Sequence, residues 1–371
     1  MKINFITPDI SRTGAIRVIV EYANRLSERG HEVLILYPFF PLNYRHGINL
    51  LNTLRFFRKV LRFFLGLRDI LNKSDLFADK NFKVKQIPII RSMFIPDADF
   101  IITSFWPAAM KIGKFNKKKG EKIYFLQANE SSFISSEKWV RRSFDFPFHF
   151  LSVSNYNRKV IKEKYGVDAE VILNGINFSV FYNENKDFNK ETINISFINN
   201  LNPVKKIGLI VEAINKVKQR YTNVTFTSFG ECKPHNLPDY VNYFKNPDDE
   251  TIREIYCNSD IFVMSSIEEA CPLSPGEAMA CKCAVVSTPV GGLVDYAIDN
   301  ETILFVEHGN PDSIYDAICK LIDDTKLREK ISLGGYKYVR EKLNWEDAVD
   351  KFEAFLKNKA VSPPKSGENS S

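Results

Sequence analysis

The chain has 371 residues, of which 44% are hydrophobic and 26% charged, and its formal net charge is +6. These proportions are ordinary for globular protein and exclude disorder over most of the chain, and the length predicts two domains rather than one. The excess of 51 Lys and Arg over 45 Asp and Glu is small, and on its own it fits an anionic lipid, a nucleic acid or no partner.

The first half of the chain alternates strand and helix patterns. A helix over residues 14–29 ends at Gly30, whose freedom at positive φ suits a helix terminus. A second helix is predicted over residues 155–165, and the polar stretch 183–192 is expected to link two domains. The first residues already have a strand pattern instead of that of a signal peptide, which predicts a cytoplasmic protein. Strands are predicted at residues 3–8, 32–37, 100–103, 122–126, 149–153 and 169–173.

The second half restarts the same alternation, which is typical of a doubly wound α/β fold. Strands are predicted at residues 193–198, 224–229, 260–264, 284–287 and 302–306. Helices are predicted at residues 208–221, 249–257 and 311–324, with further helical pieces over 326–356. The six cysteines and five histidines show no metal-binding spacing, so we expect free thiols in a reducing compartment and no metal site.

Two glutamates stand out at the end of the strand predicted over 260–264. Glu269 follows the strand, and Glu277 closes the run Ser274-Pro275-Gly276-Glu277, which fits a capping box with Ser274 as N-cap. A helix is therefore predicted to begin at Ser274. Taken singly, Glu277 is better explained as a helix cap and Glu269 as a solvated loop carboxylate. Together they flank the carboxyl end of a strand and a helix N-terminus, where α/β proteins bind ligands, and carboxylates suit a ligand rich in hydroxyl groups.

This segment resembles the E-x7-E region of retaining GT-B glycosyltransferases, especially glycosyltransferase family 4. Other landmarks resemble the family in the same order along the chain, from Met1 to about Leu356. They are the first strand, loop and helix (residues 11–33), the end of the first domain (152–157 and 171–181), the phosphate-binding entry to the second domain (199–213) and a Gly-Gly turn (290–295).

The resemblance implies an α/β GT-B fold, with two Rossmann-like domains facing across a cleft. Its expected parts are an acceptor-side domain (1–182), a nucleotide-sugar domain (183–345), a helix returning to the first domain (346–360) and a disordered tail (361–371). The implied reaction moves a hexosyl or deoxyhexosyl group from a nucleotide-sugar to a saccharide or lipid-linked acceptor, with retention, in cell-surface polysaccharide or glycolipid synthesis. No cofactor, metal or nucleic acid is implied.

The resemblance also assigns roles to single residues. Glu277 is expected to hold the ribose hydroxyls, Glu269 the hydroxyls of the donor sugar, and Lys205 the diphosphate. Gly14 is expected to let the backbone approach the phosphates. The remaining donor-side candidates are Asn200, the amide of Leu273 and the helix beginning at Ser274, and the acceptor-side candidates are Gln127 and Glu130.

Several positions depart from the family pattern. Asn200 stands where arginine is usual, Ala270-Cys271-Pro272 replaces Gly-Phe-Gly, and Lys206 and Lys282 replace glycines. Residues 122–130 resemble a rhamnosyltransferase-like subset of the family. Two alternatives remain open: a nucleotide-sugar epimerase or hydrolase of the same fold, and a non-catalytic sugar-nucleotide-binding or scaffolding subunit, which Asn200 and Pro272 favour.

Residues 50–68 form a basic amphipathic pattern with aromatic residues on its apolar arc. Such a helix binds an anionic membrane surface, or its apolar arc packs on the sheet while its basic face is solvated. The first reading predicts peripheral attachment at the inner face of the membrane. The basic arc consists of Arg55, Arg58, Lys59 and Arg62.

Overall fold

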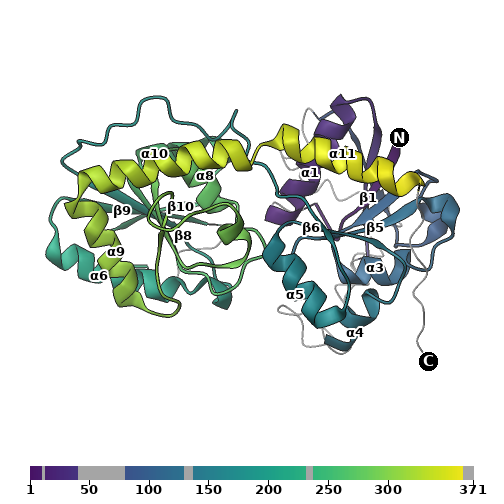
Figure 1. The fold of residues 1–371 in the computed structure, drawn as a ribbon, viewed down its shortest axis with the longest axis horizontal. Coiled ribbons are helices and arrows are strands. Elements are labelled where there is room, and N and C mark those ends of the chain that lie inside the picture. The colour runs from purple at the N-terminus through teal and green to yellow at the C-terminus, as the bar shows by residue number, and fades with distance from the viewer. Residues whose placement is uncertain (11–12, 41–79, 129–136, 231–236, 362–371) are drawn as a thin grey trace, which may run out of the picture. The chain divides into compact units, whose positions relative to one another are not determined.

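The computed structural model describes residues 1–10, 13–40, 80–128, 137–230 and 237–361 (Figure 1). The chain divides into two compact units. Unit 1 comprises Met1–Val153, Arg158–Ile172 and Val349–Ser371, and unit 2 comprises Ser154–Asn157 and Leu173–Ala348. The chain thus passes to unit 2 after Ile172, and not at the position 182 expected from the sequence. Residues 55–62, which the sequence offers for membrane binding, lie outside the described residues, as do Glu130 and most of the tail expected to be disordered.

The described part of unit 1 contains a parallel sheet in the order β3-β2-β1-β4-β5-β6-β7. Its strands are β1 (Lys2–Ile6), β2 (Glu32–Pro38), β3 (Lys83–Ile87), β4 (Phe100–Thr103), β5 (Glu121–Leu126), β6 (His149–Ser152) and β7 (Glu170–Val171). Its helices are α1 (Gly14–Glu28), α3 (Trp106–Ile112), α4 (Glu137–Ser143), most of α5 (Asn155–Tyr165) and the larger part of α11 (Trp345–Val361). Three of these elements, β3, α3 and α4, were not expected from the sequence.

Helices cover both faces of this sheet, which is why its central strands are largely apolar. On one face Phe125 of β5 packs against Tyr22 of α1 and Phe352 of α11, with ring centroids 5.6 and 5.9 Å away. On the other face the neighbouring Tyr124 packs with Phe144, beyond the end of α4, at 5.3 Å. Figure 1 shows α1 and α11 on the first side and α3, α4 and α5 on the second.

Charged contacts also fasten α11 within unit 1. Arg29 Nη1 lies 3.1 Å from Glu353 Oε2, and His31 Nε2 lies 2.7 Å from Glu353 Oε1. Glu353 is largely buried, and these partners compensate its lost hydration. The part of α11 from Val349 onward therefore belongs to unit 1.

Unit 2 contains, among its described residues, a parallel sheet in the order β10-β9-β8-β11-β12-β13. Its strands are β8 (Ile193–Ile198), β9 (Val224–Gly230), β10 (Val241–Lys245), β11 (Ile261–Met264), β12 (Ala284–Ser287) and β13 (Leu304–Phe305). Its helices are α6 (Ile207–Arg220), α7 (Asp249–Asn258), α8 (Ser274–Ala280), α9 (Pro311–Asp323) and α10 (Thr325–Lys342). Of these elements, β10 was not expected from the sequence.

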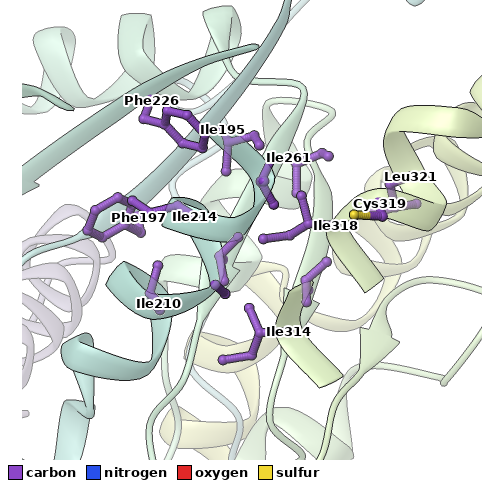
Figure 2. Close-up of a cluster of buried hydrophobic side chains, with 14 of the residues drawn as sticks. Ile195, Phe197, Ile210, Ile214, Phe226, Ile261, Ile314, Ile318, Cys319 and Leu321 are labelled. Atoms are coloured by element: carbon purple, nitrogen blue, oxygen red, sulfur yellow. The ribbon is translucent and has the colours of Figure 1, made fainter. Parts of the chain in front are cut away.

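Alternate side chains of each strand serve opposite faces of the unit 2 sheet, as the period of two requires. Val263 belongs to a core cluster with α6 and α9, whereas Phe262 belongs to one with α7, α8 and α10. Figure 2 shows the first cluster, in which Ile210 and Ile214 of α6 and Ile314 and Ile318 of α9 gather around β8. Both layers are needed to bury the strands, so unit 2 is a three-layer α/β unit.

The stretch expected to be a linker is part of unit 2. Lys186 Nζ lies 3.4 Å from Asp260 Oδ1, and both side chains are only 2% exposed. Lys186 also donates to the Ser259 carbonyl, and the Asp260 carboxylate accepts from the backbone N–H of Asn194 at 2.9 Å. A buried ion pair of this kind fixes a segment in place, so residues 183–192 do not form a free connection.

Candidate functional site

Three loops of unit 2 meet at the carboxyl edge of its sheet. They follow β8, β11 and β12, which are neighbours in the strand order. In parallel α/β sheets this edge is where loops from adjacent strands form ligand sites. The loop after β8 carries Lys205, the loop after β11 carries Glu269, and the loop after β12 contains Gly291 and Gly292.

Lys205 and Glu269 form an ion pair at this edge. The Lys205 ammonium donates to Glu269 Oε1, and the Ser266 hydroxyl donates to the same oxygen at 2.9 Å. The side chain of Lys205 is 30% exposed and that of Glu269 is 16% exposed. One cation and one carboxylate that are predicted to bind a donor therefore lie in contact with each other and are accessible to solvent.

Side-chain-to-backbone bonds shape the loop that carries Lys205. Asn200 Oδ1 accepts from the N–H of Asn202 at 2.8 Å, and Asn202 Oδ1 accepts from the N–H of Val204 at 3.2 Å. The Ser265 hydroxyl then donates to the carbonyls of Lys205 and Lys206, at 2.9 and 3.0 Å. Asn200 is exposed, and the bond that its side chain accepts from Asn202 lies within its own turn.

Two positions have lysine in this chain where the family pattern has glycine, and their backbone conformation explains that pattern. Lys206 has φ 49° and Lys282 has φ 59°, both in the left-handed region. Glycine enters this region freely, whereas an L-residue with a side chain costs about 1–2 kcal/mol there. The chain has therefore kept the backbone conformation typical of glycine while placing a cation at each position.

The loop from Glu269 to Pro272 is fixed through its carbonyl groups. The Ala270 carbonyl accepts from Gly292 N at 2.8 Å and from Ser154 Oγ at 2.6 Å, and the Pro272 carbonyl accepts from the Tyr296 hydroxyl. Pro272 has no N–H to donate, but its carbonyl is used. Backbone and side-chain donors thus fix the position of the loop through these two carbonyl groups.

Gly291 lies against the backbone of Glu269. Its φ is +53°, and a Cβ built on it would lie 1.6 Å from the Glu269 carbonyl oxygen. No side chain fits at that distance, so only glycine permits this approach. The Gly-Gly turn is a sequence signal that could have identified this support, since it stands among the family landmarks.

Tyr296 was not identified from the sequence, although both glutamates lie near it. Its side chain is fully buried, and burial raises the pKa of its phenol well above the ordinary value of 10. The negative charges of Cys271, Glu269 and Glu277 add to this rise in the pKa. Glu269 and Glu277 therefore both lie close enough to Tyr296 to influence its phenol.

The helix α8 begins at Ser274 as predicted, but the capping box does not form. The N-cap is Leu273, with φ −87° and ψ −30°, and its side chain makes no capping hydrogen bond. The N–H of Glu277 bonds to the Leu273 carbonyl at 2.9 Å, which closes the first turn one residue earlier than expected. Ser274 is thus the first helical residue and not the cap.

Two predicted site residues lie in unit 1. Gly14 is the first residue of α1, and a Cβ added to it would meet no atom within 4 Å among the described residues. Gln127 follows β5, and its Nε2 is buried without a hydrogen-bond partner in the described structure. An unsatisfied buried amide costs about 1–3 kcal/mol, which a ligand acceptor would relieve.

Within the ranges described, no group of three or more His, Cys, Asp or Glu side chains is arranged to hold a metal ion. Across the same ranges, no helix combines the length and apolarity needed to span a bilayer.

Comparison with known proteins agrees with this geometry. Residues 181–338 match the family of glycosyl transferases group 1. The capsular polysaccharide biosynthesis glycosyltransferase CapM of Staphylococcus aureus is 27% identical over 204 residues, covering 50% of this chain and 54% of CapM. The chain spans about half the length of the curated relatives it matches.

Solved structures match nearly the whole chain. Anabaena HepE in complex with UDP-glucose superposes with a TM-score of 0.74 at 14% identity, over 96% of this chain and 100% of HepE. Sucrose-phosphate synthase from Thermosynechococcus elongatus gives a TM-score of 0.71 at 16% identity, over 98% of this chain and 100% of the synthase. Residues 181–338 are therefore similar to the glycosyl transferases of group 1, and the chain has the GT-B fold of two Rossmann-like α/β units.

Proposed function

We propose that this chain is a glycosyltransferase that moves a hexosyl or deoxyhexosyl group from a nucleotide-sugar to a saccharide or lipid-linked acceptor, with retention. The observation that carries the proposal is the Lys205–Glu269 pair at the carboxyl edge of the unit 2 sheet. The match of residues 181–338 to group 1 glycosyl transferases supports the same reaction class.

The pair suggests how the donor is received. A diphosphate carries more negative charge than one carboxylate, so it competes with Glu269 for the Lys205 ammonium. Once Lys205 turns to the phosphates, Glu269 keeps the bond from Ser266 and has acceptor capacity left for the hydroxyls of the donor sugar. Lys205 then stabilises the negative charge that grows on the departing diphosphate. A fixed cation in this role needs no cofactor, and we propose that none is required.

Three further parts of the proposal rest on specific positions. Glu277 is proposed to hold the ribose, with the start of α8 near the diphosphate. Gly14, exposed and surrounded by open space, is proposed to let the backbone of unit 1 approach the phosphates. Gln127 is proposed to donate its unpaired amide to the acceptor, because a buried N–H without a partner favours a ligand oxygen there.

A role in cell-surface polysaccharide or glycolipid synthesis, at the inner face of the membrane, is also proposed. CapM, a relative, is named for capsular polysaccharide biosynthesis. In unit 1, Trp139 of α4 is 41% exposed and carries the Arg142 guanidinium 5.9 Å from its ring. An exposed tryptophan among basic residues suits an anionic membrane surface.

The membrane proposal is tested by flotation with anionic liposomes. Changing Arg55, Arg58 and Arg62 together to Ser, or Trp139→Ala, is expected to reduce co-flotation, whereas neutral liposomes should float little protein in either case. Unchanged co-flotation of both variants would sink the proposal.

The reaction is tested by screening nucleotide-sugars for binding and turnover with a lipid-linked acceptor extract. With the donor identified, Lys205→Ala and Glu269→Gln are each expected to lower kcat/KM about 100-fold or more, as expected when a preorganised charged group at the reacting centre is lost. Lys216→Ala is the matched control. Lys216 also forms an ion pair, with its Nζ 2.5 Å from Asp312 Oδ1, but it lies elsewhere in unit 2. Equal activity of the Lys205 and Lys216 variants would contradict the proposed role of Lys205.

A non-catalytic sugar-nucleotide-binding subunit is the second candidate. It is favoured by Asn200, which adds no charge, and by Pro272, which offers no N–H to the phosphates. Binding of nucleotide-sugars without transfer or hydrolysis would support it over the enzyme. An epimerase or hydrolase of the same fold would instead convert the donor without any acceptor.

A further inference from the structure

The described residues of unit 2 enclose a cavity of about 540 Å³ at the amino edge of the sheet. It is lined by the first residues of β8 and β9, by β10 and by one side of α7. The Lys205–Glu269 pair lies at the carboxyl edge. Strand β8 runs from one edge to the other over six residues, at about 3.3 Å per residue, so roughly 20 Å separate the two places. The cavity is therefore separate from the proposed donor site.

The sequence of β9 and β10 explains why the sheet is open here. Alternate residues of a strand serve opposite faces. Val224 and Phe226 of β9 are at most 3% exposed and belong to the core cluster with α6 and α9, where Figure 2 shows Phe226. The residues between and after them, Thr225 and Thr227, serve the face on the side of α7, as does Asn242, the register partner of Thr227 on β10. Polar residues at every second position predict a face that meets solvent, and the cavity lies on this face.

Hydrogen bonds within the protein fix part of the polar lining. The Thr225 hydroxyl donates to Asn194 Oδ1, and Asn194 Nδ2 donates to the Asn258 carbonyl at 2.9 Å. Thr225 thus uses its one proton within the protein, and its oxygen is left to accept from a ligand. The Thr227 hydroxyl and the Asn242 amide add groups that both donate and accept. The cavity therefore offers donors and acceptors from three adjacent strands.

Aromatic rings supply an apolar part of the lining. Tyr240 is 36% exposed; its ring centroid lies 5.3 Å from that of Phe226, and its hydroxyl donates to Asn215 Oδ1 at 2.5 Å. These contacts hold the ring in one orientation. Phe244 of β10 is half-buried and also lines the cavity. A pyranose has an apolar face of C–H groups beside its hydroxyls, and an aromatic ring can cover that face.

The charge of the lining argues against an ionic ligand. Lys218 and Glu254 are the charged residues among those described that line the cavity, one of each sign. The lining therefore has no net charge, and it lacks the excess of cations that a phosphate, a phospholipid or a nucleic acid requires. The volume lies within the range of about 300–1,000 Å³ that is usual for small-molecule sites. A neutral ligand with many hydroxyl groups matches these properties.

We propose that this cavity binds a neutral oligosaccharide. The hydroxyls of the ligand exchange hydrogen bonds with Thr225, Thr227 and Asn242, and the Tyr240 ring covers the apolar face of one sugar. A glycan held here stays attached to the protein away from the edge that carries Lys205. The proposal does not rest on the transfer reaction proposed above, because the lining contains none of the residues assigned to that reaction.

The experiment measures the binding of cellohexaose, maltohexaose and hexa-N-acetylchitohexaose to the full chain by isothermal titration calorimetry. We expect at least one of these probes to bind and to slow amide hydrogen exchange in β10 and α7. Changing Thr227→Val and Asn242→Ala together removes two hydrogen-bonding groups and should weaken binding about tenfold. Tyr240→Ala should weaken it about fivefold. The matched control combines Thr222→Val with Asn189→Ala, at exposed positions of unit 2 outside the cavity, and should bind as the parent protein does.

Lys205→Ala separates this proposal from the proposed reaction. It should weaken the binding of nucleotide-sugars and leave oligosaccharide affinity within about twofold, whereas the double variant of Thr227 and Asn242 should do the reverse. Oligosaccharide binding that persists when no nucleotide-sugar is turned over would support this site and count only against the reaction.

Three results would overturn the proposal. The first is no binding of any of the three probes at millimolar concentration. The second is equal weakening by the cavity variants and by the matched control. The third is binding of the anionic hexagalacturonic acid as tightly as the best neutral probe. If the double variant of Thr227 and Asn242 folds poorly, Tyr240→Ala and the exchange map of the parent protein decide between the outcomes.

Discussion

Gly291→Ala tests whether the Gly-Gly turn positions Glu269. The new Cβ would begin 1.6 Å from the Glu269 carbonyl oxygen, and real Cβ contacts are essentially never shorter than 3.0 Å. The two backbones must therefore separate by at least 3.0 − 1.6 = 1.4 Å. The moving group is the residue that accepts from Lys205 and Ser266, so the substitution acts directly on the predicted donor site.

The expected magnitude has two parts. Alanine at φ +53° costs about 1–2 kcal/mol, and forced separation of packed groups costs about 1–3 kcal/mol more, for a total of about 2–5 kcal/mol of unfolding free energy. A displacement of about 1 Å at a reacting centre lowers catalysis about 100-fold. We expect the transfer rate to fall by at least that factor in the protein that remains folded.

Gly309→Ala is the matched control. Gly309 has φ +73°, but a Cβ there would meet nothing within 4 Å among the described residues, so only the conformational cost of about 1–2 kcal/mol applies. Urea unfolding measures stability, and titration with the nucleotide-sugar found in the screen measures donor binding. If Gly291→Ala loses no more stability than Gly309→Ala and binds donor normally, the turn does not position Glu269.

Three further predictions concern the stability of unit 2 and are measured by denaturant unfolding. Tyr296→Phe leaves the Pro272 carbonyl without its donor and should cost about 1–3 kcal/mol. The unmodified protein should lose stability above about pH 10, because the raised pKa of Tyr296 makes the folded state keep a proton that the unfolded state releases there. In the Phe variant this decline should be shallower. An unchanged alkaline slope would contradict this. Lys186→Met removes one of two cations beside the buried Asp260, while Lys190 Nζ remains 3.7 Å from it, and should cost about 1–3 kcal/mol; no measurable loss would show that the Lys186–Asp260 pair is not buried in solution. Gly208→Ala, on an open face of α6, should instead gain about 0.5 kcal/mol, and a loss would indicate an unseen contact.

The central elements of each sheet could be predicted because their sequence pattern is local. The strands β4, β8 and β12 were predicted with their observed bounds, since apolar residues predominate in each and helices cover both faces of the sheets. The edge strands β3 and β10 were missed because their side chains are mostly solvated. In β3, Lys83 and Lys85 are exposed, so no run of apolar residues marks the strand.

The sequence named candidate site residues but not the contacts between them. The spacing of Glu269 and Glu277 pointed to one edge of the sheet, whereas the pairing of Glu269 with Lys205 joins loops 64 residues apart and follows only from the strand order. The capping box at Ser274 was wrong because the sequence pattern does not determine which carbonyl closes the first turn. Tyr296 gave no signal, because its role depends on burial beneath the loop that it supports.

The buried pair of Lys186 and Asp260 determines where a fragment containing only unit 2 has to begin. Composition alone would start an isolated second domain at Ile193, after the polar stretch, and such a fragment would leave the Asp260 carboxylate in the interior without Lys186. A fragment that starts at Leu173 retains the pair and should remain folded when expressed alone. The polar stretch before β8 thus supplies the cation that pairs with a buried carboxylate of unit 2, and an isolated unit 2 has to include it.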